Sequence, residues 1–220
     1  MARLEGRAGL GRNGCMGQQV RKLLPSEIGE ASHLLGRAFA ADPFIAYLLP
    51  DARRRRWVFP PFFRTVMHHA VALGTAWASE DGGRLIGAAV WFPPDASSAS
   101  QFLRIRTAAN TAMVRCLFPR ASSRLFGAFS SLGELHPEAP HWYLAFIGVE
   151  PGAQGRGVGR SLLEPTLARA DREGTICYLE TPFEQTHPFY RRHGFEITAE
   201  LHPIPGAPPV WTMTRLPSEV

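Results

Sequence analysis

A glycine-rich segment over residues 150–160 carries the strongest chemical signal in the sequence. It reads EPGAQGRGVGR, follows an apolar stretch typical of a buried strand, and precedes a stretch typical of a helix. Glycine lets a backbone approach a ligand closely, and the unpaired amides at a helix N-terminus attract an anion. The segment therefore predicts an anion site, and a pyrophosphate is its natural occupant.

Two other kinds of phosphate-binding loop do not fit this segment. A P-loop requires Lys and then Ser or Thr after its last glycine, whereas Val158 follows Gly157 and Arg160 follows Gly159. A dinucleotide-binding fingerprint that begins at Gly155 requires a glycine where the chain has Arg160. A glycine-rich turn that only connects a strand to a helix is the remaining alternative.

The elements that must position this site follow an α+β order. Residues 1–19 are rich in glycine and have no apolar period, so we expect a disordered extension, and residues 20–220 are expected to form one domain. The turn residues at 80–83 predict a hairpin. Strands are expected over 20–24, 75–79, 84–91, 141–149, 176–180, 195–201 and 210–215, and helices over 26–39, 53–73, 97–135 in two pieces, 157–173 and 186–193.

Composition narrows the class of protein that carries the site. The 220 residues are 45% hydrophobic and 20% charged, as in ordinary globular proteins. The net charge is +5, of which residues 1–19 contribute +2, so the remainder is too mildly basic to indicate nucleic-acid binding. No apolar run is long enough for a membrane span, and no signal peptide is recognised. Three widely spaced cysteines indicate neither a disulfide framework nor a zinc site, so a cytoplasmic location is expected.

The ordered motifs of the second half resemble the GNAT acyl-CoA N-acyltransferases. The glycine-rich segment, with its Gln154-x-x-Gly157-x-Gly159 pattern, resembles the acetyl-CoA loop of that family. Residues 141–216 are similar to the branch that contains puromycin N-acetyltransferase and its actinobacterial relatives, whereas the first half matches only loosely. The motifs that carry the likeness are Ile147-Gly148-Val149, Tyr178-Leu179-Glu180, the segment FYRRHGF at 189–195, WTMTR at 211–215, and, more loosely, Ala38-Phe39, Asp42-Pro43 and AVWFPP at 89–94.

This resemblance implies a fold and an activity. The fold would be α+β and GNAT-like, with a mixed, mainly antiparallel central sheet of about seven strands, flanking helices and a βα acyl-CoA-binding loop. Residues 20–140 would form the acceptor-side half and residues 141–216 the acetyl-CoA-binding half. The activity would be direct transfer of an acetyl group from acetyl-CoA to the amine of a small molecule, where positioning supplies much of the catalysis.

The resemblance also implies which residues hold acetyl-CoA. Backbone groups of Ile147 and Val149 are expected to bind the pantetheine arm. Amides of the glycine-rich loop are expected to bind the pyrophosphate, and Arg156 and Arg160 add positive charge. The full cofactor-binding set is Ile147, Gly148, Val149, Gln154, Gly155, Arg156, Gly157, Val158, Gly159 and Arg160.

Tyr190 and Glu180 are the catalytic candidates. Tyr190 matches the family tyrosine whose hydroxyl protonates the departing thiolate, although a tyrosine that only packs its ring is the alternative. Glu180 matches a position where relatives have an acid that acts as a base, and an ordinary charge at a strand end is equally open. Relatives often have Asn four residues before the tyrosine, whereas this chain has Thr186, which leaves the hydrogen bond of that Asn in doubt.

The acceptor is expected to bind in the first half of the chain. Phe39, Asp42, Trp91 and His136 are the predicted substrate-binding residues, although Asp42 also fits a helix cap and His136 a surface position. Histidines show no metal-ligand spacing, so no metal is expected. A non-catalytic acyl-CoA-binding module and an enzyme that acetylates protein amines are the alternative functions. The sequence leaves open the acyl chain length, an oxygen acceptor and the oligomeric state.

Overall fold

The computed structural model describes residues 17–94, 136–202 and 205–218, and all that follows concerns these residues. The expected helices within 97–135 and most of the expected N-terminal extension lie outside them. The elements are β1 (Gln18–Lys22), η1 (Pro25–Glu27), α1 (Ile28–Ala38), α2 (Pro43–Leu48), α3 (Ala52–Ala72), β2 (Ala76–Asp81), β3 (Arg84–Phe92), β4 (His141–Val149), η2 (Pro151–Ala153), α6 (Val158–Glu173), β5 (Ile176–Thr181), η3 (Glu184–Thr186), α7 (His187–Arg191), β6 (Glu196–Leu201) and β7 (Val210–Arg215).

These strands form a seven-stranded sheet in the order β1-β2-β3-β4-β5-β7-β6. Neighbouring strands are antiparallel except β4 and β5, which are parallel. The α+β, mainly antiparallel fold expected from the sequence is therefore confirmed. The expected hairpin is also present, because Gly82 and Gly83 both have positive φ (59° and 80°) between β2 and β3, as a two-residue primed turn requires.

Most element boundaries lie within two residues of those expected. The first strand begins at Gln18, so the last two residues of the expected extension belong to the sheet. Asp42 and Pro43 start a separate helix, α2, which was not among the expected helices, although Asp42 was noted as a possible helix cap. Gly174 ends α6 with a φ of 61°, as expected for a C-terminal glycine.

The sheet has a hydrophobic core on each face. Helices α1 and α3 cover one core, and α6 with α7 covers the other. Two glycines let helices approach the sheet: a Cβ at Gly87 would lie 2.8 Å from Val158 of α6, and a Cβ at Gly148 would lie 2.7 Å from Leu35 of α1. Helices therefore pack closely on both faces of the sheet at β3 and β4, and this packing fixes the position of these two strands.

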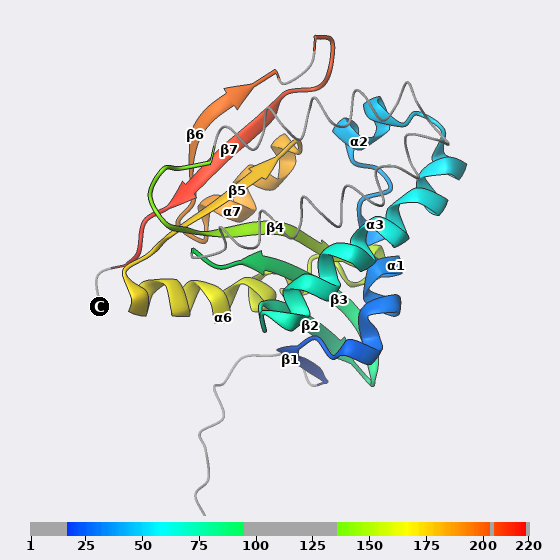
Figure 1. Ribbon diagram of the computed structural model, residues 1–220, viewed down its shortest axis with the longest axis horizontal. Coiled ribbons are helices and arrows are strands. Elements are labelled where there is room, and N and C mark those ends of the chain that lie inside the picture. Colours follow the sequence, from blue (N-terminus) through cyan, green and yellow to red (C-terminus); the bar gives the residue numbers. More distant parts are fainter. Residues whose placement is uncertain (1–16, 95–135, 203–204, 219–220) are drawn as a thin grey trace, which may run out of the picture.

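Strands β4 and β5 separate beyond the middle of the sheet. They pair only over His141–Leu144 and Ile176–Leu179, although β4 continues to Val149 and β5 to Thr181. Figure 1 shows the two strands diverging toward their C-terminal ends. The register of β3 against β4 also shifts between Val90 and Trp91, which leaves an extra residue in β4 at the point of divergence. The result is an opening in the middle of a continuous sheet.

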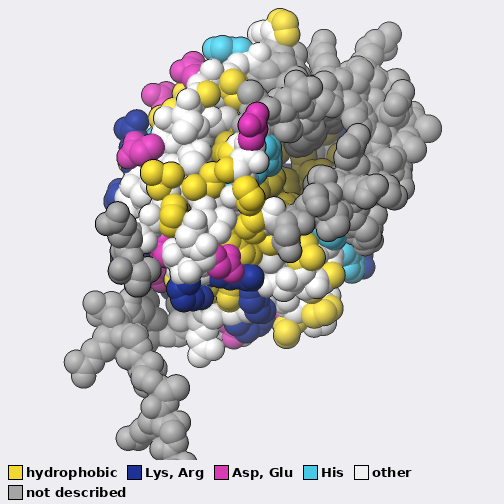
Figure 2. Space-filling view, turned by 60° about the vertical axis from the view of Figure 1, so that its left-hand side comes forward, with side chains coloured by type: hydrophobic (Ala, Val, Ile, Leu, Met, Phe, Trp, Pro, Cys, Tyr) yellow, Lys and Arg dark blue, Asp and Glu magenta, His cyan; other side chains and the backbone are white. Residues whose placement is uncertain are grey.

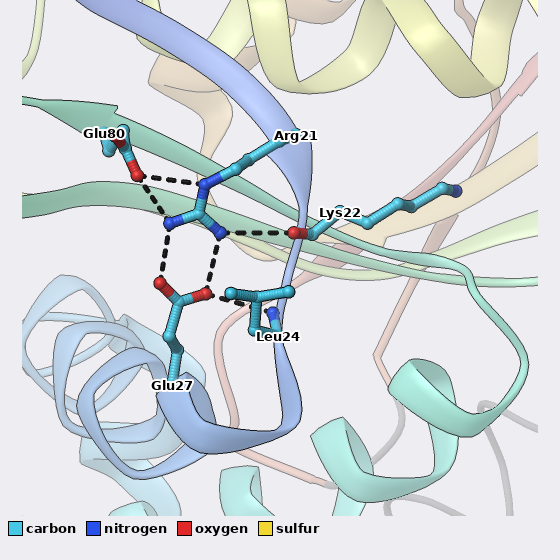
Figure 3. Close-up of polar contacts among 5 residues, drawn as sticks. All are labelled: Arg21, Lys22, Leu24, Glu27 and Glu80. Atoms are coloured by element: carbon cyan, nitrogen blue, oxygen red, sulfur yellow. Dashed lines mark hydrogen bonds and ion pairs between the residues drawn. The ribbon is translucent and has the colours of Figure 1, made fainter. Parts of the chain in front are cut away.

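An ion-pair network holds the first strand to its neighbours. Figure 3 shows the Arg21 side chain between the carboxylates of Glu27 and Glu80. Arg21 Nη2 lies 2.6 Å from Glu27 Oε1, and Arg21 Nε lies 2.9 Å from Glu80 Oε2. Its hydrogen bond to Arg21 lowers the pKa of Glu27, and the same carboxylate accepts a hydrogen bond from the Leu24 amide. The network joins β1, η1 and β2.

The charged surface visible in Figure 2 is mixed in sign. A band of hydrophobic side chains crosses the middle of that face, and basic side chains gather near its lower edge with acidic ones among them. This pattern agrees with the modest net charge of +5. Within the described residues, no helix is both long and apolar enough to cross a bilayer.

Candidate active site

The glycine-rich loop forms an open helix N-terminus directly after β4. Gly155 and Gly157 have positive φ (75° and 82°), and Gly157 is the N-cap of α6. The first backbone hydrogen bond of the helix runs from the Ser161 amide to the Gly157 carbonyl, at 3.1 Å. The amides of Val158 and Gly159 therefore lack partners within the helix, as does that of Arg160.

Open space surrounds these amides. A Cβ at Gly155 or at Gly157 would meet no atom of the described residues within 4 Å, so none of their side chains fills the space beside these two glycines. Gly159 differs, because a Cβ there would lie 3.1 Å from the Phe189 ring of α7. Two of these glycines thus provide the backbone conformation, and the third provides close packing of α6 on α7. These features agree with the predicted anion site, and a pyrophosphate bound there stays a prediction.

The two arginines of the loop are held by acidic side chains. Arg156 Nη2 lies 2.7 Å from Oδ2 of Asp81 in the β2–β3 hairpin, and Arg160 Nε lies 2.7 Å from Oε1 of Glu164. The Arg160 side chain is 72% exposed and also lines an open pocket with Glu164, Arg192 and His193. Both arginines are near the helix N-terminus and remain accessible enough to exchange partners.

Gln154 fixes the exit from β4. Its side-chain amide donates a hydrogen bond of 3.3 Å to the Val149 carbonyl. Ile147 and Val149 are half-buried and pack against the α6-side core, whereas Gly148 is pressed against α1 on the other face. The three residues lie where β4 no longer pairs with β5, which agrees with the predicted strand edge for a pantetheine arm. Their contact with a ligand stays a prediction.

Tyr190 lies in the core between the sheet and α7. The residue is 7% exposed, and its ring packs on Phe189 and Phe195 with centroid distances of 5.1 and 6.0 Å. Among the described residues its hydroxyl has no hydrogen-bond partner. Burial raises the pKa of Tyr190, so the phenol stays protonated at neutral pH, as a proton donor must be. The ring therefore has a structural role, and the hydroxyl is not used by the fold.

Thr186 does not replace the asparagine of the relatives. Its hydroxyl lies 2.7 Å from the Phe183 carbonyl and 3.0 Å from the Thr181 hydroxyl. These contacts close the turn between β5 and α7. The doubt raised by the sequence is therefore supported, because this side chain is occupied by its own loop.

Glu180 lies on β5 beside an aromatic cluster. Its side chain is only 9% exposed, and Oε1 lies 3.3 Å from Nε2 of His136. That oxygen is buried and has no hydrogen-bond partner of good geometry among the described residues, and the same is true of the Tyr178 hydroxyl. Burial raises the pKa of Tyr178, and the nearby Glu180 charge adds to the effect. A buried carboxylate oxygen and a buried phenol without partners indicate a place for a polar ligand.

The rest of the cluster comes from β4 and from the segment just before it. The His136 ring lies 4.5 Å from the Tyr143 ring and 4.8 Å from the Tyr178 ring, and 5.2 Å from that of His141. Burial, with Glu180 second, raises the pKa of Tyr143 well above its usual value. Tyr143 and Tyr178 are partners in the parallel pairing of β4 with β5. His141, Tyr143 and Tyr178 were missed by the sequence reasoning.

The predicted acceptor residues do not all lie together. Phe39 is half-buried on the α1 side, where its ring packs on Phe146 of β4 at 5.8 Å. Trp91 is fully buried in the core on the opposite face, under α6. The expectation that these two line one pocket is therefore corrected, because the sheet separates them. Phe92, the next residue, is on the Phe39 side and stacks on Tyr143 at 6.3 Å.

Asp42 acts as a helix cap. It is 3% exposed, and its Oδ1 accepts a hydrogen bond of 2.8 Å from the Ile45 amide at the start of α2. Burial raises its pKa to about 6. The capping alternative is thus the one that the geometry supports, and the contact of Asp42 with an acceptor stays a prediction. Within the described part of the chain, no group of three or more acids, histidines and cysteines could hold a metal ion.

Comparison with known proteins extends these observations. The chain matches the family model for "Acetyltransferase (GNAT) family" over residues 43–195. It is 25% identical over 192 residues to an uncharacterized N-acetyltransferase of Schizosaccharomyces pombe, covering 83% of this chain and 76% of that protein. A Corynebacterium glutamicum structure described as "histone acetyltransferase HPA2 and related acetyltransferase" aligns with a TM-score of 0.66 at 23% identity, over 93% of this chain and 99% of that one.

Two further solved structures share the fold. A polyamine N-acetyltransferase of Drosophila melanogaster aligns with a TM-score of 0.53 at 17% identity, covering 90% of this chain and 99% of that one. The ribosomal-protein-S18-alanine N-acetyltransferase of Escherichia coli aligns with a TM-score of 0.52 at 14% identity, covering 92% and 96%. The family model matches more than half of the chain. The sheet order and the divergence of β4 from β5 agree with that match. The protein therefore belongs to the GNAT acetyltransferase family.

Proposed function

We propose that this protein transfers an acetyl group from acetyl-CoA directly to the amine of a small molecule. The observation that carries the proposal is the open helix N-terminus at Gly157, which follows a strand edge that has parted from its neighbour. Unpartnered amides, positive-φ glycines and two arginines suit a pyrophosphate. The free edge of β4 beside them suits the amide-bearing pantetheine arm, since that arm pairs as a peptide does.

The loop would bind the phosphates by exchanging partners. Arg156 would leave Asp81 and Arg160 would leave Glu164, each for a phosphate oxygen. Both pairs are partly exposed, and such pairs contribute only about 0–1 kcal/mol, so the exchange costs little. The pocket that Arg160 lines with Arg192 provides further positive charge on the α7 side.

In the proposed reaction, Glu180 would act on the acceptor amine and Tyr190 on the departing sulfur of the donor. The Glu180 carboxylate would take a proton from the acceptor amine, whose lone pair then attacks the thioester carbonyl. A C–N bond forms, the C–S bond breaks, and the Tyr190 hydroxyl would donate a proton to the departing sulfur. The second proton that the nitrogen loses on becoming an amide would return through solvent to the Tyr190 oxygen. General acid or base assistance of this kind contributes about 10²- to 10⁴-fold each.

The acceptor side favours a small amine over a protein segment. Glu180 is 9% exposed and is surrounded by the rings of Tyr143, Tyr178 and His136. A buried carboxylate among aromatic rings attracts a compact cation and leaves little room for a folded chain. Structures that share the fold include enzymes of both kinds: one is described as forming N-acetylagmatine, and another acts on an alanine of a ribosomal protein.

A melting experiment tests the donor. Acetyl-CoA at 100 times its dissociation constant should stabilise the protein by about 2.7 kcal/mol, seen as a higher melting temperature. Gly157→Glu should abolish the shift, because it adds bulk and negative charge at the proposed pyrophosphate site. Gly74→Glu is the matched control, since Gly74 also has positive φ and open surroundings but lies between α3 and β2. No shift with the unaltered protein would refute the donor assignment.

A panel of acceptors tests the second half of the proposal. Release of the CoA thiol should be fastest with small primary amines that carry an apolar body, and slow with peptides that present an N-terminal amine or a lysine. Preference for peptides would move the function to the protein-acetylating alternative. Binding of acetyl-CoA without turnover on any amine would favour the non-catalytic module.

A further inference from the structure

Two imidazoles connect a backbone carbonyl to the Glu180 carboxylate. His141 Nδ1 lies 2.8 Å from the Ala139 carbonyl oxygen, and His141 Nε2 lies 3.0 Å from His136 Nδ1. At the inner end, His136 Nε2 lies 3.3 Å from Glu180 Oε1. The contacts run from the surface side of β4 to the buried carboxylate on β5.

The carbonyl at the outer end determines the position of every proton in this chain of contacts. A carbonyl only accepts, so His141 must carry its proton on Nδ1. Burial lowers the pKa of His141, so the ring is neutral and its Nε2 is an acceptor. His136 must then donate from Nδ1. A neutral His136 is left with a lone pair on Nε2, which faces the carboxylate oxygen of Glu180.

We infer that His136 and Glu180 together form the proton acceptor of the active site, and that His141 is the positioning residue that selects the tautomer of His136. The contact between His136 and Glu180 joins two acceptors, so it lacks one proton. The pair is built to take up a single proton and to hold it between Oε1 and Nε2.

The balanced step follows from this arrangement and rests on the proposed function. An acceptor ammonium loses a proton: its N–H bond breaks, and the proton settles between Glu180 Oε1 and His136 Nε2. The amine keeps the electron pair with which it attacks the thioester. His136 is 27% exposed on its side chain and returns the proton to water after the reaction.

The other groups that face His136 are phenols. The rings of Tyr143 of β4 and Tyr178 of β5 both contact the His136 ring, and both have raised pKa values, so they remain neutral through the working range. Glu180 is the acidic group and His141 the basic group in the cluster. The phenols therefore take no part in proton uptake by His136 and Glu180.

Nitrogen NMR tests the tautomer without requiring any activity. Long-range ¹H–¹⁵N spectra of the full chain above the titration should show both His136 and His141 protonated on Nδ1. His141→Phe removes the acceptor, so His136 should change to the Nε2-protonated tautomer and donate to Glu180. His141→Gln places an amide oxygen near the lost Nε2 and should restore the Nδ1 form. His33→Gln, an exposed site on α1, is the control.

The pH dependence of turnover tests the consequence. In His141→Phe a hydrogen bond from His136 stabilises the Glu180 anion, so the acidic limb of kcat should move down by about 1 pH unit. The plateau kcat should fall about 10-fold or more, with KM for acetyl-CoA unchanged, and the Gln variant should recover both. An Nε2-protonated His136 in the unaltered protein would overturn the inference. Failure of the proposed function would instead appear as no turnover together with the expected tautomers.

Discussion

The hydroxyl of Tyr190 can be separated from its ring by a single substitution. Tyr190→Phe keeps the packing on Phe189 and Phe195 and removes a group that no described residue bonds. We expect kcat to fall about 10-fold or more while the dissociation constant of CoA stays the same, as for a contact made only in the transition state. Melting temperature should be unchanged. Tyr47→Phe, which removes an exposed hydroxyl bonded to the Pro205 carbonyl, is the control.

Asp42 should make stability depend on pH in the unusual direction. Its pKa rises from 3.8 to about 6 on folding, so the folded chain binds this proton more tightly than the unfolded chain. Stability contributed by the protonated form is present below 3.8 and is lost as the pH rises through about 6.

Asp42→Asn should therefore stabilise the protein at pH 8. Asn still accepts the hydrogen bond from the Ile45 amide but carries no buried charge. The gain in free energy of unfolding should be about 1–3 kcal/mol at pH 8, at about 1.4 kcal/mol per pKa unit, and should vanish near pH 4. Urea denaturation at both pH values measures it. Asp51→Asn, at the half-exposed cap of α3, should show no comparable gain, and an equal gain there would reject the burial argument.

The alternation of side chains along a strand explains which predicted site residues could be assigned to the correct face of the sheet. Trp91 and Phe92 belong to one motif, AVWFPP at 89–94, and Trp91 was predicted to bind the acceptor. Successive side chains in a strand point to opposite faces, so only one of them could lie with Phe39. That argument needs no structure, and it selects Phe92 once Phe39 is assigned to its face. The capping role of Asp42 was also readable, from the proline that follows it.

At the scale of elements, local signals in the sequence were sufficient to predict the helices, strands and turns. They were not sufficient to predict which side chains the pairing of distant strands brings together. Gly82, Gly83 and Gly174 have positive φ angles, and a glycine that allows such an angle can be recognised in the sequence. The cluster at Glu180 depends on a parallel pairing between β4 and β5, which sets Tyr143 beside Tyr178 across a separation of more than 30 residues. One signal was available: His141 with Tyr143, and Tyr178 with Glu180, alternate on strands that are otherwise apolar.

The packing of α1 on β4 offers a test at this scale. Gly148→Ala would place a Cβ 2.7 Å from Leu35 and 2.9 Å from the Ala38 side chain, so helix and strand must move apart. We expect a loss of about 1–3 kcal/mol in the free energy of unfolding. Gly29→Ala, in α1 with nothing within 4 Å of the added Cβ, should instead gain up to about 1 kcal/mol. Equal effects of the two changes in denaturant titration would contradict this account of β4.

The whole molecule consists of two cores that share one sheet, and that sheet is opened between β4 and β5. The α1–α3 core lies on the proposed acceptor side, and the α6–α7 core supports the proposed phosphate loop. Four residue pairs, His141–Leu144 with Ile176–Leu179, connect β4 to β5. A donor that lies along the opening would contact elements on both sides of it, and so would couple the halves without changing the fold.

Hydrogen exchange can detect that coupling. CoA at 100 times its dissociation constant should slow exchange limited by global unfolding about 100-fold throughout the sheet. Amides of β4 beyond Leu144 that face the opening, and those of 158–160, should gain additional protection, because in the unliganded chain they lack backbone partners. Gly157→Glu should remove both effects, and Gly74→Glu should retain them. Protection confined to the loop, with none along β4, would mean that the donor does not lie in the opening between the strands.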